Sequence, residues 1–163
     1  MPSRRTLLRT ASVAAGSLAG CSALARGVDG YVQLKSIEAR EGSTDRPFTT
    51  ILRVTLSSPP GASQPEVTHS HDEWIDRFDT PHNPIVSDVI HDDLTRAYST
   101  VKYVIGVCSP SWRDRGESVG CTNDAASRTA FNRVQVHDRV RASTDDGSLS
   151  IHSVAGPWPF ESQ

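Results

Sequence analysis

Histidines and carboxylates gather in one segment of the sequence, residues 69–93, which reads HSHDEWIDRFDTPHNPIVSDVIHDD. This segment holds four of the six histidines: His69, His71, His82 and His91. Neutral imidazoles beside carboxylates are ligands that zinc and copper accept. The spacing matches neither a helical His-Glu-x-x-His pattern nor His-x-His-x-Asp-His, because Asp72 follows His71 directly. We therefore expect a solvated polar loop without a cofactor, and a transition-metal site is the alternative.

A candidate nucleophile lies in GESVG, residues 116–120, where Ser118 is the centre of a Gly-x-Ser-x-Gly pattern. That pattern exposes a serine where a strand turns sharply into a helix. The preceding residues, SPSWRDR, have no strand character, and the chain is short for an α/β-hydrolase. No catalytic residue is therefore predicted, and a non-catalytic domain is favoured over an enzyme.

Two aromatic segments are candidates for binding. The loop 109–120 carries Trp112 beside Arg113 and Arg115, a composition found in binding hot spots. Trp112 is nevertheless expected to fold back over the sheet. The tail GPWPF, residues 156–160, carries Trp158 and Phe160, which are expected to seal the edge of the core rather than dock a peptide.

Apolar patterning predicts five strands that must position these residues. The alternation is cleanest around Leu52, Val54 and Leu56, which share one face, whereas a change of parity predicts a bulge near Lys35 and Ser36. A run that is apolar on both faces predicts a central strand, and the turn TDDG predicts a hairpin between the last two strands. The predicted strands cover residues 31–40, 49–58, 101–108, 132–142 and 148–154.

One helix is predicted within NPIVSDVIHDDLTRAYST, residues 83–100. Apolar residues recur there at three- and four-residue intervals, which is typical of a helix with one buried face. Asn83 is the expected N-cap and Pro84 fits the first turn. Asp92 and Arg96 have the spacing of an i, i+4 ion pair. The apolar face comprises Val86, Ile90, Leu94, Ala97 and Tyr98.

The amino terminus, SRRTLLRTASVAAGSLAGC at residues 3–21, has the order of an export signal, with Arg4 and Arg5 before a short apolar run. The run is diluted with Ser, Thr and Gly and falls short of the roughly 20 apolar residues that span a bilayer. Residues 3–8 closely resemble the twin-arginine motif, with Leu in place of the commoner Phe. Residues 18–21, Leu-Ala-Gly-Cys, resemble a lipobox.

The resemblance implies a twin-arginine-exported lipoprotein in which Cys21 becomes the first mature residue and carries a lipid. Residues 1–20 are then a signal peptide, 21–30 the lipidated cysteine and tether, and 31–163 a single extracytoplasmic domain. The domain is expected on the outer face of the cell membrane, with an envelope protein as a candidate partner. The acidic and lysine-poor composition is similar to that of lipoproteins of halophilic archaea.

Assigning Cys21 to lipid, as this resemblance implies, leaves Cys108 and Cys121 as an even pair. Outside the cell the pair is expected to form a disulfide. The alternative is a two-thiol metal or redox site, although no close Cys-x-x-Cys is present. The resulting pinned loop is the favoured contact surface for a partner.

Charge and element order limit the remaining possibilities. Removing residues 1–20 takes away three arginines, which leaves 14 basic against 19 acidic residues and a net charge of about −5. This balance argues against nucleic acid as a partner. The order of elements predicts an α+β fold, a mainly antiparallel sheet with one packed helix. An immunoglobulin-like β-sandwich is the alternative, because the strands are numerous and one disulfide is available.

Overall fold

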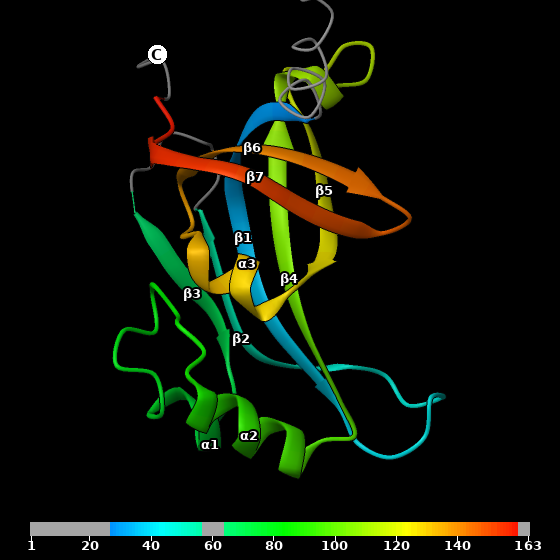
Figure 1. The fold of residues 1–163 in the computed structure, drawn as a ribbon, viewed down its shortest axis with the longest axis vertical. Helices are drawn as coiled ribbons and strands as arrows, with labels where there is room; N and C mark the ends of the chain where they lie inside the picture. The colour runs from blue at the N-terminus through cyan, green and yellow to red at the C-terminus, as the bar shows by residue number, and fades with distance from the viewer. Residues whose placement is uncertain (1–26, 57–63, 160–163) are drawn as a thin grey trace, which may run out of the picture.

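The computed structural model describes residues 27–56 and 64–159 of the 163-residue chain. Arg4, Arg5, Cys21 and Phe160 lie outside the described residues. The described part is mainly β, with short helices between the strands (Figure 1). In chain order the elements are β1 (Val28–Arg40), β2 (Thr49–Leu56), β3 (Pro65–Ser70), α1 (Asp72–Ile75), α2 (Asp88–Ala97), β4 (Thr100–Ser109), the 3₁₀ turn η1 (Pro110–Trp112), β5 (Gly120–Ala126), α3 (Arg128–Arg133), β6 (Asp138–Asp145) and β7 (Ser148–Pro157).

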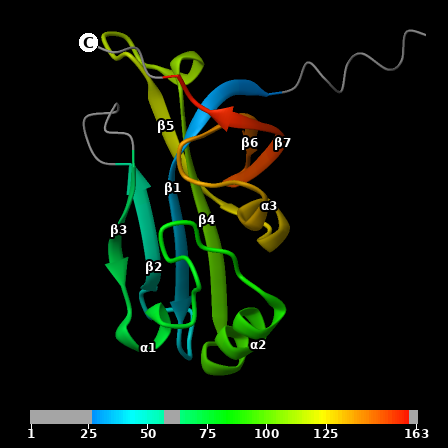
Figure 2. The ribbon, with the colours of Figure 1, turned by 90° about the vertical axis from the view of Figure 1, so that its left-hand side faces the viewer.

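The strands of the described residues form one sheet in the order β3-β2-β1-β4-β5-β7-β6, and β6 pairs back onto β1. This last pairing closes β1, β4, β5, β7 and β6 into a five-stranded barrel, from which β2 and β3 extend as a flange (Figure 2). All pairings are antiparallel except a short parallel contact between β5 and β7. Closure pairs β6 with β1 and so covers one edge that an open sheet would leave unpaired, while β3 stays an edge strand.

The length of β1 allows one strand to serve both the barrel and the flange. One of its edges pairs with β6 over residues 28–31 and with β2 over residues 34–39, while the other edge pairs with β4 over residues 31–40. The pairing of β1 with β4 shifts between Val32 and Leu34, where Gln33 is the extra residue of β1. The pairing with β2 shifts at Ile37 and Glu38, where Ile51 is the extra residue of β2. The predicted bulge at Lys35 and Ser36 is therefore displaced. Both residues are buried, which the polar sequence did not suggest.

Several predicted strands are confirmed. Residues 31–40 lie within β1, the 49–58 segment contains β2 with Leu52, Val54 and Leu56 buried, and 101–108 lies in β4, a central strand between β1 and β5. The β6–β7 hairpin is confirmed as well. Asp146 and Gly147 have φ of 47° and 74°, as a two-residue turn of the Asp-Gly type requires.

The strand predicted over 132–142 is wrong in its first half. Helix α3 occupies Arg128–Arg133, and β6 begins only at Asp138. Val134 and Val136 are buried as the alternation implied, but they lie in the connection rather than in a strand. His137, with φ of 86°, turns the chain into β6, and its backbone N–H donates to the carbonyl of Val32. Residues 134–137 are thus held by burial of the two valines and by this hydrogen bond, not by pairing within a strand.

The predicted helix is found as α2, shorter than expected at both ends. Ser87 rather than Asn83 is the N-cap, and its hydroxyl accepts from the N–H of Ile90. Ile90 and Leu94 are buried as expected. Arg96 pairs with Asp93 at i, i+3 instead of Asp92, and Asp93 also pairs with Arg77 from the loop after α1.

The predicted α+β class is therefore confirmed only in part: the sheet is mainly antiparallel and helices pack on it. The described residues hold three α-helices instead of one, although α1 and α3 have only four and six residues. An immunoglobulin-like sandwich needs two sheets, whereas the described strands form one sheet that closes on itself. The predicted tether, residues 21–30, is too long at its end, because Val28, Asp29 and Gly30 already belong to β1.

Both tryptophan predictions agree with the structure. Trp112 is partly buried against the core, and the ring of Trp158 lies 5.6 Å from that of buried Tyr31. The N–H of Trp158 donates to the carbonyl of His137. Trp158 thus packs against the end of the barrel at which β1 begins.

Candidate functional site

The four histidines of the 69–93 segment lie on different elements. His69 is on β3, His71 precedes α1, His82 lies in the loop after it, and His91 is on α2. Among the described residues, no group of three or more His, Cys, Asp or Glu is placed to hold a metal ion. The metal interpretation gains no support from this geometry and stays the alternative to a solvated polar loop.

His91 has a specific partner within the fold. Its Nδ1 and the hydroxyl of Tyr103 on β4 are joined by a hydrogen bond of 2.6 Å. The Tyr103 ring also packs on Phe131, with centroids 5.4 Å apart. Burial raises the pKa of Tyr103 above its usual range. This contact fastens α2 to the sheet, which is a structural role.

Two serines, Ser118 and Ser143, have neighbours that could suggest a nucleophile, but neither has the surroundings that a nucleophile needs. Ser118 is exposed in the loop between η1 and β5, with no strand before it and no helix after it. Ser143 lies 2.8 Å from Nε2 of His152 across the β6–β7 hairpin, a pair that sequence spacing did not indicate. Among the described residues no carboxylate hydrogen-bonds to His152, so the orienting group of a catalytic triad is missing there.

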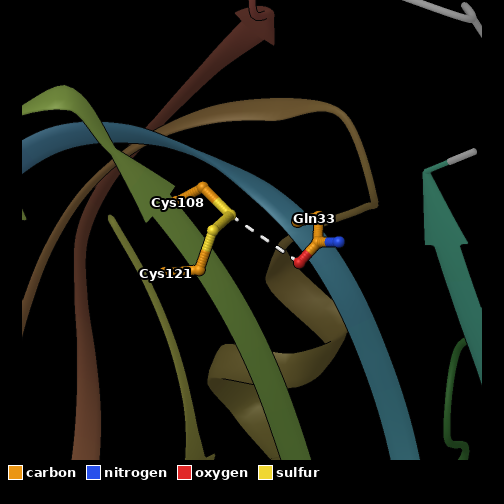
Figure 3. The surroundings of a disulfide bond; sticks show 3 residues. All are labelled: Gln33, Cys108 and Cys121. Atoms are coloured by element: carbon orange, nitrogen blue, oxygen red, sulfur yellow. Dashed lines mark hydrogen bonds between the residues drawn. A yellow bond between two sulfur atoms is a disulfide. The ribbon is translucent and has the colours of Figure 1, made fainter. Parts of the chain in front are cut away.

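The predicted disulfide is confirmed. Cys108 on β4 and Cys121 on β5 face each other in register and are bonded, and Oε1 of Gln33 lies 3.7 Å from Sγ of Cys108 (Figure 3). Cys108 is 1% exposed, whereas Cys121 lies on the exposed side of its strand. The bond closes the loop 109–120 onto the sheet. Gly120 is required where the loop returns, because a Cβ there would collide with the backbone of Trp112.

Replacing Cys108 and Cys121 together by serine is expected to lower the free energy of unfolding by about 3 kcal/mol, since the crosslink restricts the unfolded chain. Urea denaturation followed by circular dichroism measures the change. Dithiothreitol should destabilise the wild-type chain by a similar amount and leave the double variant unaffected. Equal stability of variant and wild type would contradict a structural role for the bond.

A buried lysine on β1 is the feature that sequence reasoning missed. Lys35 is 0% exposed. Its Nζ donates to the carbonyls of Pro84 and Val134 and to Oε1 of Gln135, at 2.9, 2.8 and 3.2 Å. It also lies 4.2 Å from the centroid of the Phe131 ring. The three N–H donors of the Lys35 ammonium therefore each have an acceptor. Through them, Lys35 joins β1 to the segment before α2 and to the segment after α3.

The pKa of Lys35 reflects this burial. Loss of hydration lowers the pKa from 10.5 to about 7, and the carboxylate of Asp138 opposes the shift. A buried amine of this kind can mark a reactive site. Here all three donors are occupied and the side chain is closed to solvent. We therefore assign Lys35 to the stability of the fold.

A groove with exposed apolar residues lies beside α2. It has a volume of about 430 Å³ and is lined by the loop after α1 and by the residues leading into α2. Ile85 and Val89 are 46% and 70% exposed, the large hydrophobic residues that the described surface leaves open. The groove wall comprises Arg77, Asp79, Thr80, Ile85, Ser87, Val89, Ile90 and Asp93.

The same region carries the negative charge of the domain. Residues 72–97 contain seven acidic and two basic residues, so the remainder of the chain from residue 21 onward is balanced, with 12 of each. Hydrogen bonds from Arg96 and Arg77 lower the pKa of Asp93. Five carboxylates of the segment are exposed and form no ion pair within the described residues: Asp72, Glu73, Asp76, Asp79 and Asp92.

Helix α2, beside which the groove lies, and the start of β1 lie at opposite ends of the molecule (Figure 1). Near the start of β1, the hydroxyl of Ser109 donates to the carbonyl of Asp29, which places η1 and the pinned loop at that end. The hydroxyl of Ser99, just after α2, donates to the carbonyl of Arg40 at the other end of β1. The 13 residues of β1 span about 40 Å between them.

Comparison of the chain with protein-family models, with curated proteins and with solved structures finds no match. None of the helices in the described residues has both the length and the apolar character needed to cross a bilayer. Function must therefore be argued from the residues of this chain.

Proposed function

We propose that the chain is a lipoprotein whose domain is tethered through Cys21 to the outer face of the cell membrane and binds another envelope component without catalysing a reaction. The paired arginines and the Leu-Ala-Gly-Cys sequence carry this proposal. Two long lipid chains hold a protein firmly where one holds it marginally.

The position of β1 supports a short tether. Val28, the first residue of β1, follows Cys21 by seven positions, which limits the distance between them to about 25 Å. The end of the barrel at which β1 begins would then face the membrane, together with η1 and the pinned loop. This orientation moves the partner contact away from the pinned loop, where sequence reasoning had put it, to the opposite end.

Washing of isolated membranes tests the tether. The protein should remain with the membranes in 2 M NaCl and at pH 11, because attachment through lipid does not depend on charge. The net charge of about −5 gives the protein little electrostatic attraction to anionic lipid. A non-ionic detergent should release it. Release by salt alone would show that the attachment is electrostatic and would overturn the proposal.

Elemental analysis tests the alternative metal interpretation. Protein purified without a histidine tag should contain well below one equivalent of zinc or copper. A stoichiometric metal that is lost when His69 and His71 are both replaced by alanine would favour metal binding over the proposed function.

A further inference from the structure

We propose that the groove beside α2 binds a basic segment of a partner protein and seats one aliphatic or aromatic side chain of that segment between Ile85 and Val89. The inference rests on the proposed function, because the tether places α2, beside which the groove lies, at the end of the domain away from the membrane. Apolar residues surrounded by charge are typical of an interaction site.

The chemistry of the groove selects the occupant. Ile85, Val89 and Ile90 line it with aliphatic surface, and Asp79 stands at its rim without an ion pair among the described residues. The surrounding segment 72–97 has a net charge of −5. A segment with an apolar side chain flanked by Lys or Arg matches both the aliphatic lining of the groove and the negative charge around it.

Two other occupants fit less well. A lipid surface lies beyond the start of β1 if Cys21 carries the tether, whereas Pro84, next to the groove residue Ile85, is hydrogen-bonded to Lys35, about 23 Å along β1 from its start. A second copy of the chain that presented the same face would bring two charges of −5 together, and like charges oppose association.

Fluorescence anisotropy tests the proposal with detergent-solubilised full-length protein. The probes are labelled peptides Lys-Lys-X-Lys-Lys in which X is Leu, Ile or Phe, and the control peptide has Ser at X. At 0.15 M NaCl at least one of the three apolar peptides should bind about tenfold more tightly than the Ser peptide. Binding should weaken at 1 M NaCl, because the screening length falls to about 3 Å.

Paired variants separate the groove from general charge. Replacing Ile85 and Val89 by serine should weaken binding of the apolar peptide about tenfold, and Asp79→Asn with Asp92→Asn should weaken it about threefold. Asp145→Asn with Asp146→Asn removes the same charge at the β6–β7 turn and should have no effect. Circular dichroism confirms that each variant is folded.

Three results would overturn the inference: no saturable binding by any apolar peptide up to 1 mM, unchanged affinity in the serine variant, or equal losses in the two aspartate pairs. Concentration-dependent dimerisation that Val89→Ser abolishes would assign the groove to a second copy instead. Membrane washing of the same protein reports on the tether independently, so failure of the groove and failure of the tether are distinguishable.

Discussion

Replacing Cys21 by serine is expected to move the protein from the membrane fraction to the soluble fraction, with at least a tenfold change in the ratio between them. The variant lacks the thiol that would form the thioether with lipid. Its apolar run at residues 7–18 is diluted with Ser, Thr and Gly and is too short to hold a chain in a bilayer. Immunoblots of washed membranes and supernatants measure the ratio.

Ser22→Ala is the matched control for this experiment. It changes the neighbouring residue, keeps the thiol of Cys21 and should remain in the membrane fraction. Retention of Cys21→Ser in washed membranes at the wild-type level would show that another part of the chain holds the protein there.

Replacing Lys35 by alanine is expected to lower the free energy of unfolding by about 3 kcal/mol. The change leaves a cavity and removes the donor for the carbonyls of Pro84 and Val134. Lys35→Met fills most of the volume and should cost about 1–2 kcal/mol, because only the acceptors are then unsatisfied. Urea denaturation gives all three stabilities.

The second lysine provides the control. Lys102 is exposed, and its ammonium lies 4.2 Å from the centroid of the Phe48 ring. Lys102→Ala should cost less than about 1 kcal/mol. If Lys35→Ala cost no more than Lys102→Ala, the buried side chain of Lys35 would not be a main support of the fold.

The lowered pKa of Lys35 also predicts a pH dependence. Between pH 7 and 10.5 the unfolded chain binds a proton at Lys35 that the folded chain has released, so stability rises with pH in this window. Below pH 7 the lysine is protonated in both states and its contribution to stability is smallest. The stability difference between wild type and Lys35→Met should therefore shift in favour of the wild type as pH rises. A difference that is constant from pH 6 to 10 would contradict the lowered pKa.

Sequence pattern predicts the elements that bury apolar residues regularly. The faces of β2, β4 and α2 follow from the spacing of their apolar residues, and the Asp-Gly turn predicts the last hairpin. Strands β3 and β5 do not show in the sequence, because PEVTHS is largely polar and GCTNDAA has no large aliphatic or aromatic residue. Helix α3 is too short for an apolar period to show.

The site residues were harder to predict, because they depend on contacts between distant segments. The partners of Lys35 lie 49, 99 and 100 positions away, so no local pattern marks it as buried. The groove appears only when the loop after α1 folds beside α2. Its charge, however, is a sequence property, since counting residues 72–97 alone reveals the excess of carboxylates.

The mass of the amino-terminal peptide from membrane-extracted native protein tests the tether most directly. We predict that this peptide begins at Cys21 and carries the added mass of lipid on its sulfur, with residues 1–20 removed. Recovery of an uncleaved amino terminus with an unmodified Cys21 thiol would contradict the account.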